Sequence, residues 1–455
     1  MKSVLHKVTP ELLARYNRPG PRYTSYPTAP TWKETFSEAR WNEALSTVQP
    51  PASVYLHLPF CKEQCAFCGC NMVVAKRKSI GERYIDGLEV ELKALELPAD
   101  RIPVQRIHLG GGTPTWHSPD ELERIHNLLM TRFEPTENAE LSVEADPEVT
   151  TNAHLERLFE LGWNRLSLGV QSFDSEVLEA VNRPQQHTRV HDIMQRSRDA
   201  GLNGLNLDLI YGLPHQSYES FKDTLEKTIA MRPDRLAVFS YAHLPWLRAH
   251  MARIDETALP TVDEKFALFA LALEILTDNG YQFIGMDHFA LEDDALAIAQ
   301  REGRLHRNFM GYTTDRDLDV IGLGMSAISD VNGVFAQNRS KLAHYFRALK
   351  GEEAWLEKAY ERTDEDRLRS DVIADLMCNF HVSKAQIAER HNVNFDVHFA
   401  ATLIALQPAI DEGFLKNQAD ALRVTDLGRL FVRNLAMAFD AHLGGPQTPR
   451  FSQTV

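Results

Sequence analysis

The chain has 455 residues, 44% of them hydrophobic, and a net charge of −14 from 49 Lys+Arg against 63 Asp+Glu. This length can bury a full core and predicts more than one domain of a globular protein. The acidic balance argues against broad phosphate-backbone contacts, so we expect no nucleic-acid partner, although it allows a local basic pocket for an acidic small molecule.

The chain carries no sign of export or of membrane insertion. Its first ten residues contain no continuous apolar segment, and the longest apolar run, 266–273, is too short to cross a bilayer. With few cysteines as well, we expect a cytoplasmic protein without a membrane span. We expect a monomer, because no long apolar seam is left unassigned.

The N-terminal segment, residues 1–50, is rich in Pro, Gly and Tyr around 19–27. This composition predicts an extended strap with ordered turns rather than a packed helix.

From residue 53 the sequence alternates between predicted strands and predicted helices. The strands cover 53–58, 105–109, 139–144, 165–171, 205–212 and 235–243, and the helices cover 80–95, 119–132, 152–161, parts of 174–200, and 217–231. Six such units predict an α/β fold, a partial (β/α)6 barrel of parallel strands with helices outside. We assign the barrel and its extensions to 51–360, with 281–284 and 318–323 as candidates for further strands.

Residues 361–455 form a predicted C-terminal domain that is small and mostly helical. A helix begins near 361–366, Ser383 caps another, a long apolar helix covers 397–412, and residues 413–415 start a small wing. We interpret this domain as a winged-helix-like packing module, because the acidic chain offers no case for DNA binding.

Four of the five cysteines, Cys61, Cys65, Cys68 and Cys70, lie within ten residues, and Cys378 lies far away. Structural zinc sites use two separated ligand pairs, and this chain has no second pair. The spacing C-x3-C-x2-C suits three corners of an iron–sulfur cube whose fourth iron stays open. We therefore favour an iron–sulfur site over zinc. We expect Cys70 to be free and functional, and Cys378 to be a buried apolar residue.

Each predicted strand ends in residues that suit chemistry. These are the cysteine loop, the glycine run 110–112, Glu144, Gln171, Asp208, and the pair 242–243. In barrels of parallel strands the C-terminal rim carries the active site, so we expect these positions to converge. The glycine run permits close approach of a ligand to backbone, and it equally suits a tight turn. Each polar residue alone equally suits the capping of a neighbouring helix.

Two other patterns are weaker. The run 322–327 matches the dinucleotide fingerprint G-x-G-x-x-A, but Asp330 to Gly333 interrupts any following helix, which argues against nicotinamide binding. His288 and His306 are isolated histidines, which are often satisfied structurally.

The cysteine spacing after the first strand resembles that of the radical S-adenosylmethionine superfamily. Further motifs sharpen the resemblance to the oxygen-independent coproporphyrinogen III oxidases of haem biosynthesis, and the likeness covers nearly the whole chain. These motifs are Gly69-Cys70 and the segments 20–27, 110–115, 210–214, 285–289 and 306–309.

The resemblance implies a 4Fe-4S cluster on Cys61, Cys65 and Cys68, and two molecules of S-adenosylmethionine. The first molecule would chelate the open iron. The positions that match its lining are Tyr55, Gly111, Glu144 and Ile328. The positions that match contacts of the second molecule are Phe67, Gly112, Thr113, Gln171, Arg183, Asp208 and Ala242.

The implied reaction is the oxidative decarboxylation of two propionate side chains of coproporphyrinogen III to vinyl groups, through a 5′-deoxyadenosyl radical. The product is protoporphyrinogen IX. The substrate carries four carboxylates, so we expect Arg22 and Arg307 to neutralise part of its charge, with Tyr23 nearby. We expect Cys70 to take part in catalysis. A flavodoxin- or ferredoxin-type protein is the expected reductant.

Two alternatives remain at this point. A related haem chaperone would transfer haem without oxidising porphyrinogen, but such relatives carry Phe at the position of Cys70 and lack the Arg22-Tyr23 strap. A zinc-stabilised binding protein would be colourless and free of iron.

Overall fold

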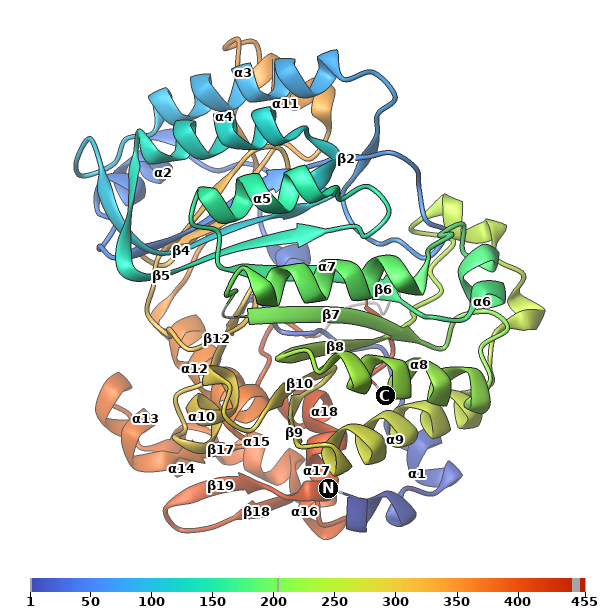
Figure 1. The fold of residues 1–455 in the computed structure, drawn as a ribbon. Coiled ribbons are helices and arrows are strands. Elements are labelled where there is room, and N and C mark those ends of the chain that lie inside the picture. Colours follow the sequence, from blue (N-terminus) through green and yellow to red (C-terminus); the bar gives the residue numbers. More distant parts are fainter. Residues whose placement is uncertain (1, 203, 444–450, 455) are drawn as a thin grey trace. The chain divides into compact units, whose positions relative to one another are not determined.

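The computed structural model describes residues 2–202, 204–443 and 451–454. All six predicted barrel strands are present and parallel, and a seventh parallel strand, β13, pairs with β1. Their order is β13-β1-β4-β5-β6-β7-β8, and Figure 1 labels the run from β4 to β8. The strands are β1 (Ala52–Leu58), β4 (Ile102–Gly111), β5 (Phe133–Ala145), β6 (Arg165–Gln171), β7 (Gly204–Tyr211), β8 (Arg235–Ser240) and β13 (Val320–Leu323).

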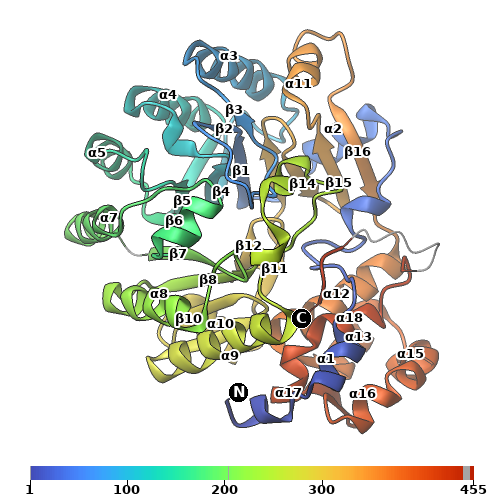
Figure 2. The ribbon, with the colours of Figure 1, turned by 90° about the vertical axis from the view of Figure 1, so that its right-hand side faces the viewer.

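Alternating side chains give these strands an apolar face and a polar face. In β7, for example, Leu205, Leu207 and Leu209 are buried, while Asn206 and Asp208 point to the opposite side. The apolar faces are covered by helices, which Figure 2 shows in an arc outside the strands. These helices are α3 (Ser79–Ala94), α4 (Pro119–Met130), α5 (Asn152–Glu160), α7 (His187–Asp199) and α8 (Tyr218–Met231). The polar faces are left for the barrel interior.

The remaining elements of this part extend the sheet or occupy its loops. Three antiparallel strands follow β13 and continue the sheet away from β1. They are β14 (Ile328–Val331), β15 (Val334–Asn338) and β16 (Leu356–Glu361). The others are α2 (Glu38–Ser46), β2 (Phe60–Cys61), β3 (Val73–Val74), η3 (Pro114–Trp116), α6 (Ser175–Ala180), η4 (Ala249–Arg253), η5 (Glu256–Ala258) and α11 (Leu342–Ala348).

Backbone contacts group the chain into two units. The barrel unit comprises Lys33–Leu259 and Asp317–Glu361, and the strap unit comprises Met1–Trp32, Pro260–Arg316 and Arg362–Val455. The contacts therefore group 260–316 with the strap unit, whereas the sequence alternation had placed these residues with the barrel. The reason lies in packing, because α10 (Ala295–Arg301) and β9 (Tyr281–Gly285) contact α12 (Asp364–Asn379).

The strap unit draws on all three stretches of chain. Its N-terminal stretch holds η1 (Lys2–Lys7), α1 (Pro10–Tyr16) and η2 (Ala29–Thr31). The middle stretch adds α9 (Val262–Asp278), β10 (His288–Leu291), β11 (His306–Asn308) and β12 (Gly311–Thr313). The C-terminal stretch adds β17 (His381–Ser383), α13 (Lys384–His391), α14 (Phe395–His398), α15 (Ala400–Ala405), α16 (Gln407–Asp411), β18 (Leu415–Asn417), β19 (Ala421–Val424), α17 (Asp426–Leu430) and α18 (Val432–Met437).

Two local expectations need correction. The N-terminal segment is extended around 19–27, but in the sequence helix α1 precedes that stretch and helix α2 follows it. The single helix expected over 397–412 is broken into α14, α15 and α16. Pro408 stands in the first turn of α16, where its ring supplies no amide hydrogen, and Phe399 at the first break packs its ring on Phe439. The predicted wing is present as the β18–β19 hairpin.

The strap itself is fixed by the far end of the sequence. The buried Arg433 side chain donates hydrogen bonds to the carbonyls of Pro21 (3.1 Å) and Gln453 (2.6 Å). The Gly20 amide donates to the Ser452 carbonyl (3.0 Å). Over the described ranges, no helix is long and apolar enough to cross a membrane.

Candidate functional site

The four clustered cysteines lie in the loop that leaves β1 and passes through the short strands β2 and β3. Cys61, Cys65 and Cys68 are half-buried, and Cys70 is exposed. No cysteine among them forms a disulfide. Three thiols of one loop are therefore presented together without being tied to one another.

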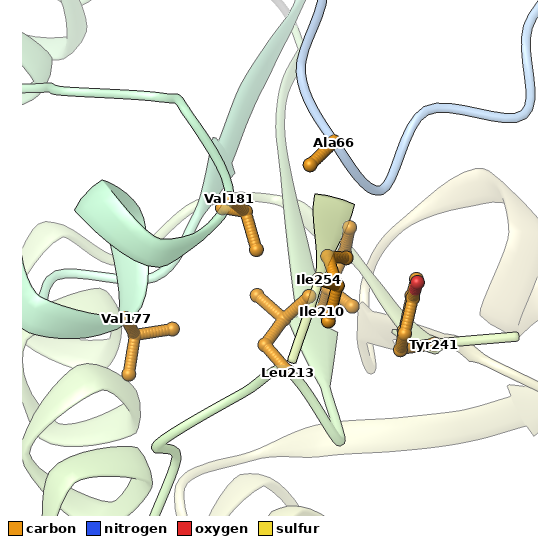
Figure 3. Packing of buried hydrophobic residues seen from close by; sticks show 7 residues of the cluster. All are labelled: Ala66, Val177, Val181, Ile210, Leu213, Tyr241 and Ile254. Atoms are coloured by element: carbon orange, nitrogen blue, oxygen red, sulfur yellow. The ribbon is translucent and has the colours of Figure 1, made fainter. Parts of the chain in front are cut away.

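An apolar cluster supports this loop from below. Ala66, between two of the cysteines, is 3% exposed and points into the cluster, as Figure 3 shows. Its other members are Val177, Val181, Ile210, Leu213, Tyr241 and Ile254. Phe67 packs against the same cluster. Burial of these side chains fixes the position of the cysteine loop, and hence of its thiols, relative to the strands.

Polar groups hold the loop from the side. Arg248 donates a hydrogen bond to the Gly69 carbonyl (2.7 Å), and the His250 ring lies 2.7 Å from the Cys68 carbonyl. Since a carbonyl oxygen accepts only, the Nε2 atom of His250 is the donor. The stretch after β8 thereby orders the backbone between the last two cysteines.

The thiols differ in their electrostatic surroundings. Burial raises the pKa of Cys61 to about 12, although the Thr113 hydroxyl lies 3.4 Å from its sulfur. Burial also raises the pKa of Cys65, and the Arg183 guanidinium, 3.4 Å from that sulfur, partly offsets the effect. A hydrogen bond with Cys70 lowers the pKa of Cys68 to about 7.

These residues fit an iron–sulfur cluster better than a single metal ion. Within the described ranges, no three His, Cys, Asp or Glu side chains gather closely enough to share one ion. A four-iron cube takes its thiolates at separate corners, so it suits three thiols spaced along a loop. Because burial raises the pKa of Cys61, iron binding there must displace a proton.

Glu144, one residue before the end of β5, is a polar residue of the barrel interior. It accepts hydrogen bonds from the Gly111 amide (3.1 Å) and from the His108 ring (3.2 Å), and its side chain keeps 42% exposure. Burial alone would raise the pKa of Glu144, but His108 and Gly111 lower it below its ordinary value. An ionised carboxylate is thus held where it remains accessible to a ligand.

The charge of Glu144 acts on two other predicted site residues, Asp208 and Tyr55. Burial, followed by the negative charge of Glu144, raises the pKa of Asp208 to about 7, even though Asn206 donates to it at 2.7 Å. Burial and the same charge also raise the pKa of Tyr55. Gln171 ends β6 with a left-handed φ of 68° and is buried.

Arg183, between α6 and α7, reaches the cysteine loop from the side. Besides Cys65, it contacts the Asp146 carboxylate (3.1 Å) and the Gly169 carbonyl (2.6 Å), and its side chain is 13% exposed. Since two acceptors fix the guanidinium, its positive charge is held in place beside the loop.

The glycine run after β4 is required by the protein's own packing. A Cβ at Gly111 would lie 2.6 Å from the His57 ring, and Gly111 has a φ of +116°. A Cβ at Gly112 would lie 2.5 Å from the Pro59 carbonyl oxygen. These glycines therefore permit close approach of β1 and β4, in addition to any role toward a ligand.

His57 is a site residue that the sequence reasoning missed. Its Nε2 atom lies 2.8 Å from the Asn71 carbonyl, which only accepts, so Nε2 carries the proton. Burial lowers the pKa of His57, which keeps the ring neutral, so Nδ1 accepts from the Tyr55 hydroxyl at 2.9 Å. The signal was available, because Tyr55 and His57 share one face of β1.

Asp146 and His108 were also missed. Both lie in the barrel unit, as do the remaining predicted positions, Ala242 and Ile328. Asp146 lies two residues after Glu144, and His108 lies on the face of β4 that carries Gly110. Ala242 follows β8, and Ile328 opens β14. The dinucleotide interpretation of 322–327 finds no helix after the glycines, because β14 follows directly.

The predicted substrate residues all lie in the strap unit and are engaged by protein groups. Arg22 forms an ion pair with Asp287. Arg307, 8% exposed, donates to the Arg22 carbonyl (2.6 Å), and the Tyr23 hydroxyl donates to Asp440 (3.0 Å). Arg22 and Arg307 are therefore brought together, but each cation already has partners. Cys378 is fully buried, as expected.

Two known families match the chain. The radical SAM superfamily matches residues 55–228, which include the cysteine loop and the strands to β7. The HemN C-terminal domain matches residues 363–431, which begin at α12.

Similarity to characterised proteins extends over almost the whole length. An oxygen-independent coproporphyrinogen III oxidase of Escherichia coli (strain K12) is 42% identical over 434 residues, and one of Synechocystis is 40% identical over 441 residues. Each alignment covers 95% of this chain and 95% of the relative. The chain belongs to the oxygen-independent coproporphyrinogen III oxidases.

Structural comparison agrees with this membership. The solved coproporphyrinogen III oxidase of Escherichia coli, described as a radical SAM enzyme, matches with a TM-score of 0.89 at 40% identity, covering 93% of this chain and 98% of that chain. The comparisons confirm the expected α/β fold with its C-terminal domain and the radical SAM oxidase function in haem biosynthesis. Membership also implies a 4Fe-4S cluster and S-adenosylmethionine as cofactors.

Proposed function

We propose that Cys61, Cys65 and Cys68 hold the 4Fe-4S cluster and that Cys70 does not. The observation that carries this assignment is the division of the loop, in which three half-buried cysteine residues precede one exposed cysteine residue. Cys70 hydrogen-bonds with Cys68 and lowers the pKa of Cys68. This interaction suits a residue that lies beside a cluster ligand and is not itself a ligand. A thiol in that position is suited to proton or hydrogen transfer close to the substrate.

The first S-adenosylmethionine lies against Tyr55, Gly111, Glu144 and Ile328. Glu144 supports this role because its carboxylate is ionised, is oriented by His108 and Gly111, and keeps accessible surface. Such a carboxylate suits the cationic or hydroxyl groups of the cofactor. When bound, the cluster and S-adenosylmethionine supply the hydrogen-abstracting chemistry of the reaction.

A second S-adenosylmethionine contacts seven further positions. They are Phe67, Gly112, Thr113, Gln171, Arg183, Asp208 and Ala242. Arg183 suits a carboxylate group and Asp208 suits an amine, a sulfonium or a ribose hydroxyl. Asp208 has a pKa near 7, so the arrival of a cation would favour its ionised form.

The substrate is coproporphyrinogen III, and two of its propionates become vinyl groups. Each propionate would lose one hydrogen atom from its β-carbon to the hydrogen-abstracting group that S-adenosylmethionine supplies, then carbon dioxide and one electron, which an electron acceptor would take up. Arg22 and Arg307 are the proposed contacts for substrate carboxylates, with Tyr23 beside them. The ion pair with Asp287 positions the Arg22 side chain. Because Asp287 neutralises part of the charge of Arg22, only the remaining part is available to a substrate carboxylate.

We further propose a flavodoxin- or ferredoxin-type reductant, a monomeric state and a cytoplasmic location.

The decisive experiment is an anaerobic assay of the purified chain with coproporphyrinogen III, S-adenosylmethionine and a reductant. We expect a brown protein that contains iron, and formation of 5′-deoxyadenosine, carbon dioxide and protoporphyrinogen IX. A colourless, iron-free protein would refute the cluster assignment. Haem binding without turnover would instead favour the chaperone.

A further inference from the structure

A buried carboxylate on helix α3 has no role in the proposed function. Glu91, on α3, is 5% exposed, and carboxylates are almost never buried in this way without partners. Three donors converge on it: the Gly324 amide (2.9 Å), the Asn338 side-chain amide (2.8 Å) and the Tyr345 hydroxyl (2.6 Å). Burial raises the pKa of Glu91 to about 7, and the three donors offset part of that effect.

Two turns earlier on the same helix, Tyr84 makes a second connection. Its buried hydroxyl accepts from the Met325 amide (2.8 Å) and donates to the His57 carbonyl (2.8 Å). Helix α3 therefore binds two successive amides, those of Gly324 and Met325, and also the end of β1. Both connections lie within the barrel unit.

The turn that these groups hold has an unusual backbone. Gly324 has a φ of +86° and Ser326 a φ of +59°, and both lie in the left-handed region. A Cβ at Gly324 would lie 2.4 Å from the Tyr84 hydroxyl. The turn leads directly into Ile328, the first residue of β14, whose backbone packs against Gly322. A backbone of this kind persists only when its surroundings fix it.

We propose that Glu91 is a positioning residue for S-adenosylmethionine. By holding the Gly324 amide and the Tyr345 hydroxyl, it fixes the turn that presents Ile328 to the cofactor. This inference rests on the proposed function, in which Ile328 lines the first molecule. Glu91 itself touches neither cofactor nor substrate in this scheme.

The test compares Glu91→Gln with Glu89→Gln in the anaerobically reconstituted chain. Glutamine at 91 replaces one accepting oxygen with an amide that faces other donors, whereas Glu89, on the same helix, has a side chain that is 39% exposed and pairs with Lys93 (2.7 Å). The Kd for S-adenosylmethionine is measured from the change that it causes in the electron paramagnetic resonance spectrum of the reduced cluster. Iron content, Tm and kcat at saturating cofactor are recorded alongside.

We expect Glu91→Gln to weaken binding at least 10-fold, with unchanged iron content and with kcat within 3-fold of the parent. Glu89→Gln should bind like the parent. A Glu91→Gln protein that is folded and binds within 2-fold of the parent overturns the inference. A purely structural role would lower Tm and leave Kd unchanged, and it would overturn the inference equally.

A second variant covers the case in which Glu91→Gln does not fold. Tyr345→Phe removes one donor and adds no polar group, and we expect a 2- to 5-fold weaker Kd. An unchanged Kd in Tyr345→Phe would then decide against the proposal. Failure of the parent chain to bind S-adenosylmethionine would refute the proposed function itself, so the two failures are distinguishable.

Discussion

Two carboxyl groups in the barrel interior, those of Glu144 and Asp208, differ in their protonation. Glu144 is kept ionised by donors, while Asp208 has a pKa near 7 because of burial and because of the negative charge of Glu144. Two carboxyl groups in one interior therefore meet a ligand in different protonation states.

The division of the cysteine loop gives the first prediction. Cys61→Ser should lose most of the roughly four irons that a full cube contains, because the cluster loses one of its three protein ligands. Cys70→Ser should keep its iron and lose decarboxylation by at least 10-fold. Iron analysis and product assay of the anaerobic proteins measure both effects. Iron loss in Cys70→Ser would show that the fourth thiol is a ligand.

The raised pKa of Asp208 predicts a pH-dependent affinity for S-adenosylmethionine. A cationic ligand prefers the ionised carboxylate, which is depleted below a pKa of about 7. Affinity should therefore rise from pH 6 to pH 8 by up to about 10-fold in total, because a group with a pKa of about 7 goes from about one tenth to about nine tenths ionised over that range. Titrations of the parent and of Asp208→Asn measure the effect. Since Asn cannot ionise, an equally steep profile in that variant would assign the dependence to another group.

The strand positions of these polar residues could be predicted from the sequence, whereas their side-chain partners could not. Glu144, Gln171 and Asp208 were singled out because a polar residue in an apolar strand stands out in a sequence, and the structure places Gln171 at the end of β6, Glu144 one residue before the end of β5 and Asp208 within β7. His57 and His108 were missed because they act through ring nitrogens whose partners, the Asn71 carbonyl and Glu144, come from other loops and strands. Sequence spacing does not encode such tertiary pairings.

At the scale of elements, the glycines at the end of strand β4 set how closely the loop after β4 packs against the start of the cysteine loop. The Gly112 amide donates to the Leu58 carbonyl (2.9 Å), and the Thr113 amide donates to Phe60 (2.9 Å). The loop after β4 is thus bonded to the chain that carries Cys61.

Gly112→Ala should disrupt this contact between the loop after β4 and the chain that carries Cys61. The added methyl group would lie 2.5 Å from the Pro59 carbonyl oxygen, a backbone atom that cannot move without displacing β1. We expect iron content to fall by more than half, as measured after anaerobic reconstitution. Gly69→Ala is the control, because a Cβ there meets nothing within 4 Å. Full iron loading in Gly112→Ala would show that β1 and β4 tolerate separation.

Element prediction succeeded where local signals were strong. The N-cap at Ser383 was predicted, and its side chain accepts the Gln386 amide at the start of α13 as expected. The long helix over 397–412 was predicted wrongly, because its apolar pattern continues through Phe399 while tertiary packing of that ring breaks the backbone run.

At the scale of the whole molecule, the strap unit is assembled from three separate stretches of chain. The sequence alternation showed where helices and strands lie, but it carried no signal that 260–316 packs with both ends of the chain. That grouping depends on contacts between residues hundreds of positions apart.

Tyr23→Phe tests how much the strap depends on its remote partner. The change removes the donor to Asp440, which is 8% exposed, and leaves a buried acceptor unsatisfied. We expect a loss of about 1–3 kcal/mol in stability. A lower Tm with unchanged iron content would report it, because the cysteine loop belongs to the other unit. Tyr218→Phe, at an exposed position, should behave like the parent. Equal Tm values for Tyr23→Phe and the parent would show that the hydrogen bond adds nothing.

The bond between Tyr23 and Asp440 also sets an order of events on the ribosome. Its partners are 417 positions apart in sequence. At a synthesis rate of about 5–20 residues per second, the strap must wait roughly 20–80 s after translation of Tyr23 before its anchor exists. The barrel unit, which holds the cysteine loop, ends at Glu361 and is complete earlier. A nascent chain can thus form the cysteine loop before the strap finds its place.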